Sequence, residues 1–135
     1  MKDDIEAVVA ANREFYRAFA DQDVEAMIAL WSDTVPVACI HPGWDALLDY
    51  DSVVASWHEI MSNPNSPDIE CRNETPFVFG GVAFVVCHEV LEQGLLAATN
   101  VFHREDDGWK LVHHQASPLA VAPEDDLSPG SSRLH

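Results

Sequence analysis

The chain has 135 residues, of which 47% are hydrophobic, and its 23 acidic side chains outnumber 7 basic ones to give a net charge of −16. This length suits one domain with its own core, and the charge disfavours nucleic acids and anionic membranes as partners, because both need a basic surface. No apolar run approaches the roughly 18 residues of a membrane span, and the acidic start MKDDIEAVV lacks an export signal, so we expect a cytoplasmic protein.

The first half of the chain has the apolar spacing of helices. Residues 3–21 form an amphipathic pattern that ends at ADQD, which predicts the first helix. Asp23 can cap a second, shorter helix with Trp31 on its apolar side. A third helix is predicted at VVASWHEIM, with Asp51 or Ser52 as its cap.

Strands are predicted on both sides of that third helix. VPVACI is a short strand that Pro36 restricts to a sheet edge or a strand beginning, and the loop HPGW, which starts at His41, follows it. After the stop SNPNSP the apolar period changes to two, which predicts strands over 68–78, 82–93, 95–105 and 108–117 joined by tight turns. Hairpin-linked strands with helices on one face make an α+β fold with a mainly antiparallel sheet.

The sequence predicts neither a metal centre nor a cofactor. The three cysteines are widely spaced, without a CxxC or Cys/His pattern. His88, His103 and His113 share one predicted strand face, but a metal there is the weaker interpretation. The domain is expected to end near residue 121, and residues 122–135, rich in Pro, Ser, Gly and acids, are predicted to form a flexible acidic tail.

Both faces of the predicted sheet are apolar. Alternate residues of the last three strands form two sets, and a sheet with one face in water would show one polar set. Three helices can cover only one face, so the other is predicted to contact a second copy in a two-fold dimer. The residues of the last strand on this outer face are expected to be Trp109, Leu111, His113 and Gln115.

Four stretches together resemble one known family: AFADQDVEAMIALW, HPGW, VVASWHEI and GWKLVHHQASP. In this order they resemble the SnoaL-like branch of the NTF2-like superfamily, and they are also similar to the association domain of calcium/calmodulin-dependent kinases. The resemblance covers residues 3 to about 118. It implies a cystatin-like α+β cone in which three N-terminal helices pack on a strongly curved sheet around a pocket. It is specific for the fold and poor for function, because the superfamily hosts isomerases, cyclases, dehydratases, transport factors and oligomerisation modules.

The resemblance also implies that the strand set with Glu89, Asn100, Phe102 and His114 faces the pocket. Glu89 among apolar neighbours would be desolvated, which raises a carboxyl pKa and suits acid–base chemistry; a solvated strand end is the alternative. His114 is either a hydrogen-bonded core residue or a second proton carrier. Asn100 could orient Glu89 or hold a ligand carbonyl.

Three further ring-bearing residues are candidates for the pocket wall. His41 begins a loop at the expected mouth, where it either contacts the ligand or holds the loop. Trp31 and Trp57 lie on the inner sides of their helices, as pocket wall or as plain core.

The sequence departs from the family at two places that matter for chemistry. Steroid isomerases of this fold use a tyrosine in the first helix as an oxyanion donor, and the matching position here is Phe15, with Tyr16 adjacent, which puts that oxyanion hole in doubt. Kinase association domains place arginines on the inner face, where this chain has Cys87, Asn100 and Ala116. An anionic ligand is therefore disfavoured.

We therefore predict a small-molecule-binding protein whose conical apolar pocket takes a neutral or cationic, largely apolar ligand. One alternative is a cofactor-independent acid–base enzyme of isomerase, cyclase or dehydratase type. In it Glu89 or His114 moves the proton and Asn100 or His41 polarises an oxygen. The other alternative is a non-catalytic oligomerisation module.

Overall fold

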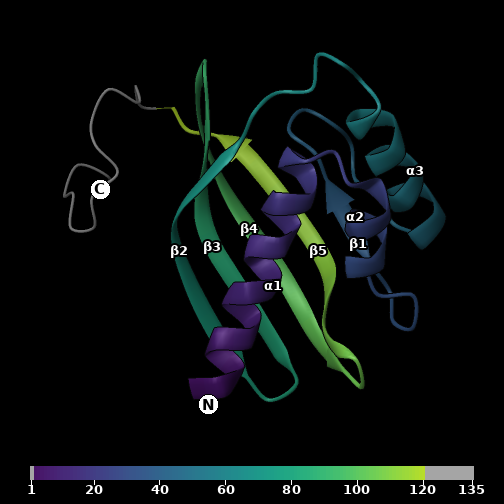
Figure 1. Cartoon of the computed structure of the whole chain (residues 1–135), viewed down its shortest axis with the longest axis vertical. Coiled ribbons are helices and arrows are strands. Elements are labelled where there is room, and N and C mark those ends of the chain that lie inside the picture. Colours follow the sequence, from purple (N-terminus) through teal and green to yellow (C-terminus); the bar gives the residue numbers. More distant parts are fainter. Residues whose placement is uncertain (1, 121–135) are drawn as a thin grey trace.

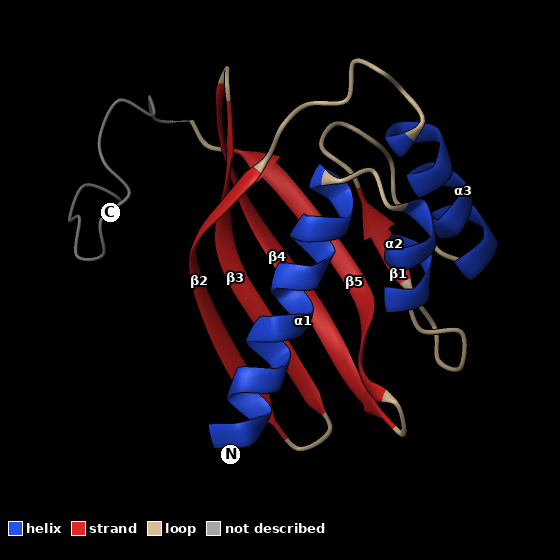
Figure 2. Cartoon of the chain, in the orientation of Figure 1, coloured by secondary structure: helices blue, strands red, loops and turns tan. Residues whose placement is uncertain are grey.

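The computed structural model describes residues 2–120 as three helices and five strands (Figure 1). The predicted α+β class is confirmed, with the helices gathered on one face of the sheet (Figure 2). The tail predicted at 122–135 lies outside the described residues. In chain order the elements are α1 (Lys2–Ala20), α2 (Val24–Leu30), β1 (Ala38–Ile40), α3 (Tyr50–Met61), β2 (Glu70–Phe79), β3 (Val82–Leu91), β4 (Gly94–Glu105) and β5 (Gly108–Pro118).

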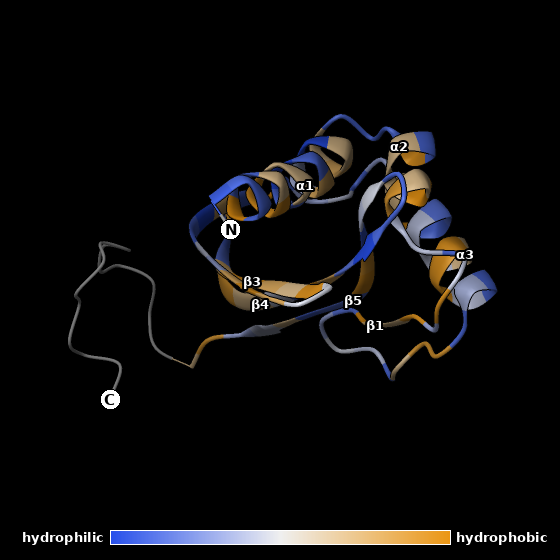
Figure 3. Cartoon of the chain, turned by 90° about the horizontal axis from the view of Figure 1, so that it is seen from below, coloured by the Kyte–Doolittle hydropathy of each residue, from blue (hydrophilic) through white to orange (hydrophobic). Residues whose placement is uncertain are grey.

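The sheet has the strand order β1-β5-β4-β3-β2 and curls around α1 (Figure 3). β1 pairs with β5 in parallel, and every other neighbouring pair is antiparallel. β1 lies at a sheet edge just after Pro36, as predicted. Beyond it, the loop residue Leu47 exchanges two backbone hydrogen bonds with Cys39, at 2.9 and 2.8 Å.

The helix boundaries follow from their caps. The Asp23 carboxylate accepts from the Ala26 amide at 3.1 Å and caps α2 as predicted. The cap of α3 is Asp49 and not Asp51 or Ser52, so that prediction is wrong. Asp49 has an extended backbone, and its carboxylate accepts from the Ser52 amide at 2.8 Å, which draws the next residues into the first turn.

A bulge in β5 changes which side chains face the helices. Val101 pairs with His113 but Phe102 pairs with Leu111, so Val112 is an extra residue in the strand. One extra residue moves all side chains before it to the opposite face. Leu111 and Trp109 therefore face inward, 0% and 8% exposed, and the prediction that they lie on the outer face is wrong. His113 and Gln115, after the bulge, keep the predicted outer parity.

A second bulge lies in β2, at the edge nearest α1. Pairing passes from Arg72↔His88 to Thr75↔Val86, and Asn73 between them has φ 59°. The extra residue turns Asn73 toward His88, at 3.1 Å, and turns Glu74 toward α1. Cys71 before the bulge and Glu74 after it therefore both contact the helix layer.

The core fills the space between the helices and the inner face of the sheet. Val8, Phe15 and Met27 from the helix layer meet Val85 and Phe102 from the strands, all at most 2% exposed. Within residues 2–120 none of the helices combines the length and the apolar character that a bilayer crossing requires. Most of the inner face of the sheet is therefore packed against the helices, and one part of it lines a cavity.

Candidate functional site

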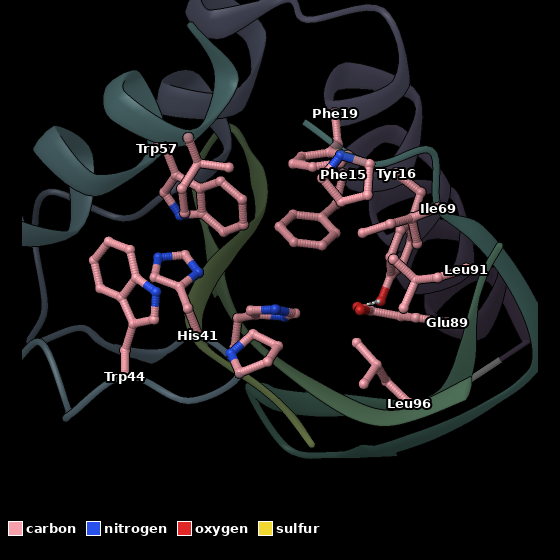
Figure 4. Close-up of a pocket in the computed structure, with 14 residues that line it drawn as sticks. Phe15, Tyr16, Phe19, His41, Trp44, Trp57, Ile69, Glu89, Leu91 and Leu96 are labelled. Atoms are coloured by element: carbon pink, nitrogen blue, oxygen red, sulfur yellow. Dashed lines mark hydrogen bonds between the residues drawn. The ribbon is translucent and has the colours of Figure 1, made fainter. Parts of the chain in front are cut away.

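A cavity of about 380 Å³ lies between α1, α3 and the inner face of the sheet (Figure 4). This volume suits a small organic molecule. Neither lysine nor arginine occurs in its wall. The wall is formed by Phe15, Tyr16, Phe19, His41, Pro42, Trp44, Trp57, Ile60, Pro67, Ile69, Glu89, Leu91, Leu96 and His114.

Aromatic rings packed against one another, mostly edge to face, form one side of the cavity. Phe15 meets the rings of Trp57 and His114, with centroids 5.5 and 5.0 Å away. His41 packs against Trp57 at 4.7 Å and against Trp44 at 4.8 Å. Trp44 is 40% exposed, which places it at the mouth, while Phe15 and Trp57 are buried in the wall.

Glu89 carries a carboxyl into this apolar space. It is 3% exposed, and its Oε2 accepts a hydrogen bond of 2.6 Å from the Tyr16 hydroxyl (Figure 4). Burial raises the pKa of Glu89, although the Tyr16 bond works in the opposite direction. Burial also raises the pKa of Tyr16, so its hydroxyl remains a proton donor. This environment suits Glu89 to acid–base chemistry.

His114 presents one unprotonated ring nitrogen. Its Nδ1 lies 2.5 Å from Asn100 Oδ1, and an amide oxygen only accepts, so Nδ1 carries the hydrogen and Nε2 keeps a lone pair. Burial, with His41 and His113 nearby, lowers the pKa of His114 to about 3. The ring is therefore neutral at pH 7, and its free nitrogen can accept a hydrogen bond.

Asn100 connects the two groups without lining the cavity. Its Nδ2 donates to Tyr16 Oη at 3.2 Å and to Asn12 Oδ1 at 2.8 Å, while its Oδ1 accepts from His114. One fully buried amide thus orients both His114 and the Tyr16–Glu89 pair. The predicted role in orienting Glu89 fits this geometry better than direct ligand contact.

His41 is held by the helix beneath it. Its Nε2 lies 2.9 Å from Ser56 Oγ, whose hydroxyl donates to the Val53 carbonyl at 2.7 Å. Ser56 therefore accepts from His41, and Nε2 carries the hydrogen. Burial lowers the pKa of His41 to about 4, so this ring is also neutral at pH 7.

The structure brings four of the predicted site residues to the cavity and places three elsewhere. Glu89, His114, His41 and Trp57 line the wall. Asn100 lies behind it. The other two are packed in the core beside Leu111: Trp31 forms a backbone bridge to Leu111, and Phe102 pairs with it across the sheet.

No site role was predicted for Tyr16, Phe15 or Phe19, although all three belong to the amphipathic pattern of residues 3–21 and are buried in α1. A signal for this was present in the chain: Asn12, one turn before Tyr16, is a polar residue in an apolar helix stripe. The wall residues from the 67–69 segment belong to a loop without regular periodicity, and they carry no such signal.

Residues of the types that commonly bind metal ions are scattered over the described part of the chain. Among residues 2–120 no three His, Cys, Asp or Glu side chains gather where they could hold a metal ion. The three histidines of the predicted outer set contact Asn73, Glu105 and the Ala38 carbonyl separately.

Comparison with known proteins places the chain in one group. A family model for the SnoaL-like domain matches residues 8–122. A solved structure of a dehydratase candidate of the NTF2-like family from Streptomyces avermitilis is 35% identical, with a TM-score of 0.82 over 89% of this chain and 99% of that one. A candidate calcium/calmodulin-dependent protein kinase type II association domain from Thiobacillus denitrificans is 30% identical, with a TM-score of 0.73 over 82% and 93% of the two chains.

A plant protein shares the same region. The F-box protein SKIP8 of Arabidopsis thaliana is 26% identical over 117 residues, which are 85% of this chain and 51% of the plant protein. The chain thus spans about half the length of this curated relative. Further solved structures of lower identity share the cystatin-like fold.

Proposed function

The chain belongs to the SnoaL-like family of the NTF2-like fold, and on this premise we propose that its cavity binds a neutral or cationic, largely apolar small molecule. The observation that carries the proposal is the composition of the cavity wall. Rings and aliphatic side chains form most of it, and its charged or titratable groups are limited to Tyr16, His41, Glu89 and His114.

The polar groups restrict the charge of the ligand. His114 is neutral at pH 7 and offers a lone pair, and Glu89 offers a carboxyl, so a hydroxyl or amine on the ligand would find an acceptor. A carboxylate on the ligand would meet no cation in the wall, and it would face Glu89 in a chain of net charge −16. The composition of the wall therefore disfavours anionic ligands.

A matched series of ligands tests this proposal. Naphthyl methanol, naphthyl methylamine and naphthoate share one apolar body and differ in charge. We expect the alcohol and the amine to shift the resonances of wall residues such as Phe15 and Trp57, while naphthoate shifts none. Leu96→Trp, which fills the cavity, should abolish binding, and Leu48→Trp, at a position 73% exposed, should not. Equal binding of naphthoate, or binding unaffected by Leu96→Trp, would contradict the proposal.

A second function, cofactor-independent dehydration, is favoured because Glu89 and His114 line the same cavity. In a ligand with a hydroxyl β to a carbonyl, the Glu89 carboxylate would remove the proton from the carbon between them, while His114 Nε2 accepts a hydrogen bond from the hydroxyl. Glu89 would then give the same proton to the departing hydroxyl, and a carbon–carbon double bond and water would form. The dehydratase candidate that is 35% identical supports this reaction type over isomerisation.

Turnover separates binding from catalysis. With hydroxy ketones on the same naphthyl body, Glu89→Gln should lower kcat by at least about a hundredfold, and His114→Gln, which displaces the acceptor, by about tenfold, while both keep the melting temperature. His58→Gln, on the exposed side of α3, is the matched control. Ligand binding without turnover in the native chain would leave the binding function and rule out dehydration of these compounds.

We also propose that two copies associate through the outer face of the sheet. The helices leave this face uncovered, and it carries an outer aromatic patch of Phe77, Phe79 and Phe84 with the exposed Val86 on the same face. Phe77 and Phe84 stack at 4.7 Å. Two chains of charge −16 repel, so they are expected to meet where carboxylates are absent. The outward residues of β3, from Val82 to Val90, include none. If the cavity binds nothing, this association would be the main function.

A further inference from the structure

We propose that Glu74, outside the cavity, sets which nitrogen of His114 carries the hydrogen. The connection runs through Asn12 and Asn100, two amides that are both 0% exposed. Glu74 is thus a positioning residue for the cavity. The inference concerns the ligand-free protein and does not depend on the proposed function.

The connection is a continuous series of hydrogen bonds. Glu74 Oε2 accepts from Asn12 Nδ2 at 3.4 Å, and Asn12 Oδ1 accepts from Asn100 Nδ2 at 2.8 Å. Asn100 Oδ1 then accepts from His114 Nδ1 at 2.5 Å. An amide nitrogen only donates and an amide oxygen only accepts. An amide that donates to one neighbour in the series must therefore accept from the next one.

The hydrogen bonds between Asn12 and Asn100 and between Asn100 and His114 could both also form in the reverse direction. With both amides turned over, Asn12 Nδ2 would donate to Asn100, and Asn100 Nδ2 would donate to His114 Nδ1. The hydrogen of His114 would then lie on Nε2, facing the cavity. The two directions therefore differ at the end of the series and not within it.

Glu74 distinguishes the two directions at that end. Its carboxylate forms an ion pair with Arg13 at 2.7 Å and can only accept. In the reverse direction the Asn12 oxygen would face this carboxylate and both would lack a hydrogen. The Cys71 thiol, 3.8 Å from Asn12 Nδ2 and 4.0 Å from Glu74 Oε2, also fits the observed direction, since it accepts from Asn12 and donates to Glu74.

The β2 bulge is what brings Glu74 to this place. Without the extra residue, the strand alternation that puts Cys71 on the inner face would turn Glu74 outward. Bulges commonly redirect a functional side chain, and here Asn73 adopts φ 59° while Glu74 turns toward α1.

Asn100 is also connected, through Tyr16, to a second carboxyl, that of Glu89. Glu89 accepts from Tyr16, which in turn accepts from Asn100. A protonated Glu89 could also donate to Tyr16, so this connection fixes the direction only while Glu89 is ionised. Burial, which raises the pKa of Glu89, weakens that influence, whereas Glu74 is held in place by its ion pair with Arg13.

The test measures the His114 tautomer in the ligand-free protein. In a Glu89→Gln chain, position 89 can donate or accept, and Glu74 is the only carboxylate left on the network. Ring ¹⁵N shifts of labelled histidine report which nitrogen carries the hydrogen, and His114→Gln assigns the signals. We expect the Nδ1–H form in Glu89→Gln, and a fall of about tenfold in the ratio of Nδ1–H to Nε2–H when Glu74→Gln is added.

A charge-matched control separates direction from general electrostatics. Glu70, an exposed residue of the same strand paired with Arg72, loses the same charge in Glu70→Gln and should leave the ratio unchanged. In the native chain, Glu74→Gln alone should move the ratio in the same direction by a smaller factor. The proposal is overturned if Glu89→Gln alone already shows the Nε2–H form, if Glu74→Gln moves the ratio in neither background, or if Glu70→Gln moves it equally.

Discussion

The Tyr16 hydroxyl donates to Glu89 Oε2 at 2.6 Å, a bond between residues 73 positions apart. It joins the first helix to the third strand inside an apolar cavity. An ionised Glu89 can only accept, so it takes the Tyr16 hydroxyl hydrogen, while the Tyr16 oxygen accepts from Asn100 Nδ2. The tyrosine therefore positions the carboxyl, and it is not free to act as a separate oxyanion donor while Glu89 holds it.

Tyr16→Phe removes this bond without changing the ring. The folded state should lose about 1–2 kcal/mol, since Glu89 and Asn100 each lose a partner in a buried place. The pKa of Glu89 should rise further, because the Tyr16 bond lowers it in the native protein. Urea unfolding and a carboxyl ¹³C titration measure both effects. Tyr50→Phe, at a half-buried position in α3, is the control. If Tyr16→Phe left the titration of Glu89 unchanged, the hydrogen bond between Tyr16 and Glu89 would be refuted.

His114 makes the stability of the protein depend on pH. Its pKa is about 3 in the folded state and 6.5 ordinarily, so between these values the unfolded chain binds more protons. The free energy of unfolding should therefore fall as pH drops below 6.5, by up to about 1.4 kcal/mol per pH unit for this group. The raised pKa of Glu89 changes the free energy of unfolding in the opposite direction. The effect of His114 is therefore measured as the difference in pH dependence between the native protein and a His114 variant.

His114→Gln should flatten this fall, while His58→Gln, on the exposed side of α3, should leave it as it is. Urea unfolding at several pH values on either side of 6.5 gives the slopes. Equal slopes in the native and His114→Gln proteins would show that His114 titrates normally in the folded state.

The β2 bulge depends on the left-handed backbone of Asn73. Asn73→Gly and Asn73→Ala both remove the contact with His88, but only alanine has a Cβ that opposes φ 59°. We expect Asn73→Ala to be less stable than Asn73→Gly by about 1 kcal/mol. Chemical denaturation compares the two, and an alanine variant as stable as the glycine one would mean that the bulge relaxes to a regular strand.

The outer aromatic patch predicts the effect of one acidic substitution. Phe77 is 44% exposed, and Phe77→Asp should convert a dimer into a monomer with little loss of stability, since a new carboxylate would face the partner. Leu48→Asp makes the same kind of change at a position 73% exposed and should leave the dimer intact. Light scattering after size-exclusion chromatography reads the mass, and a native chain that is already monomeric would contradict the dimer.

The fold could be predicted from the sequence because its periodicities are clear and local. Apolar spacing located the helices, and alternation located β2 to β5 to within a few residues. What alternation could not show is a bulge, since one extra residue leaves the local pattern unchanged and reverses the face of all that precedes it. This is why His113 and His114 were placed on opposite faces correctly while Trp109 and Leu111 were not.

The candidate site was harder to predict because it depends on distances between elements. The apolar strand neighbours of Glu89 indicated burial but left a solvated strand end as the alternative, and the structure buries this side chain. The contacts of Asn100, by contrast, join α1 to two strands, and nothing local to Asn100 indicates that Asn12 and Tyr16 lie opposite it. Trp31 and Phe102 were correctly predicted to point into the interior. The sequence does not show, however, which part of the interior is packed and which part contains a cavity.

The two margins of the sheet are both unsuited to growth by strand addition. On one side the chain's own Leu47 occupies the hydrogen-bonding groups of Cys39. On the other side β2 carries Pro76, which has no amide hydrogen to offer, and the ion pair of Glu70 with Arg72. A crowded solution of this protein should therefore resist fibril formation, and the proposed dimer would use the outer face of the sheet instead of its edges.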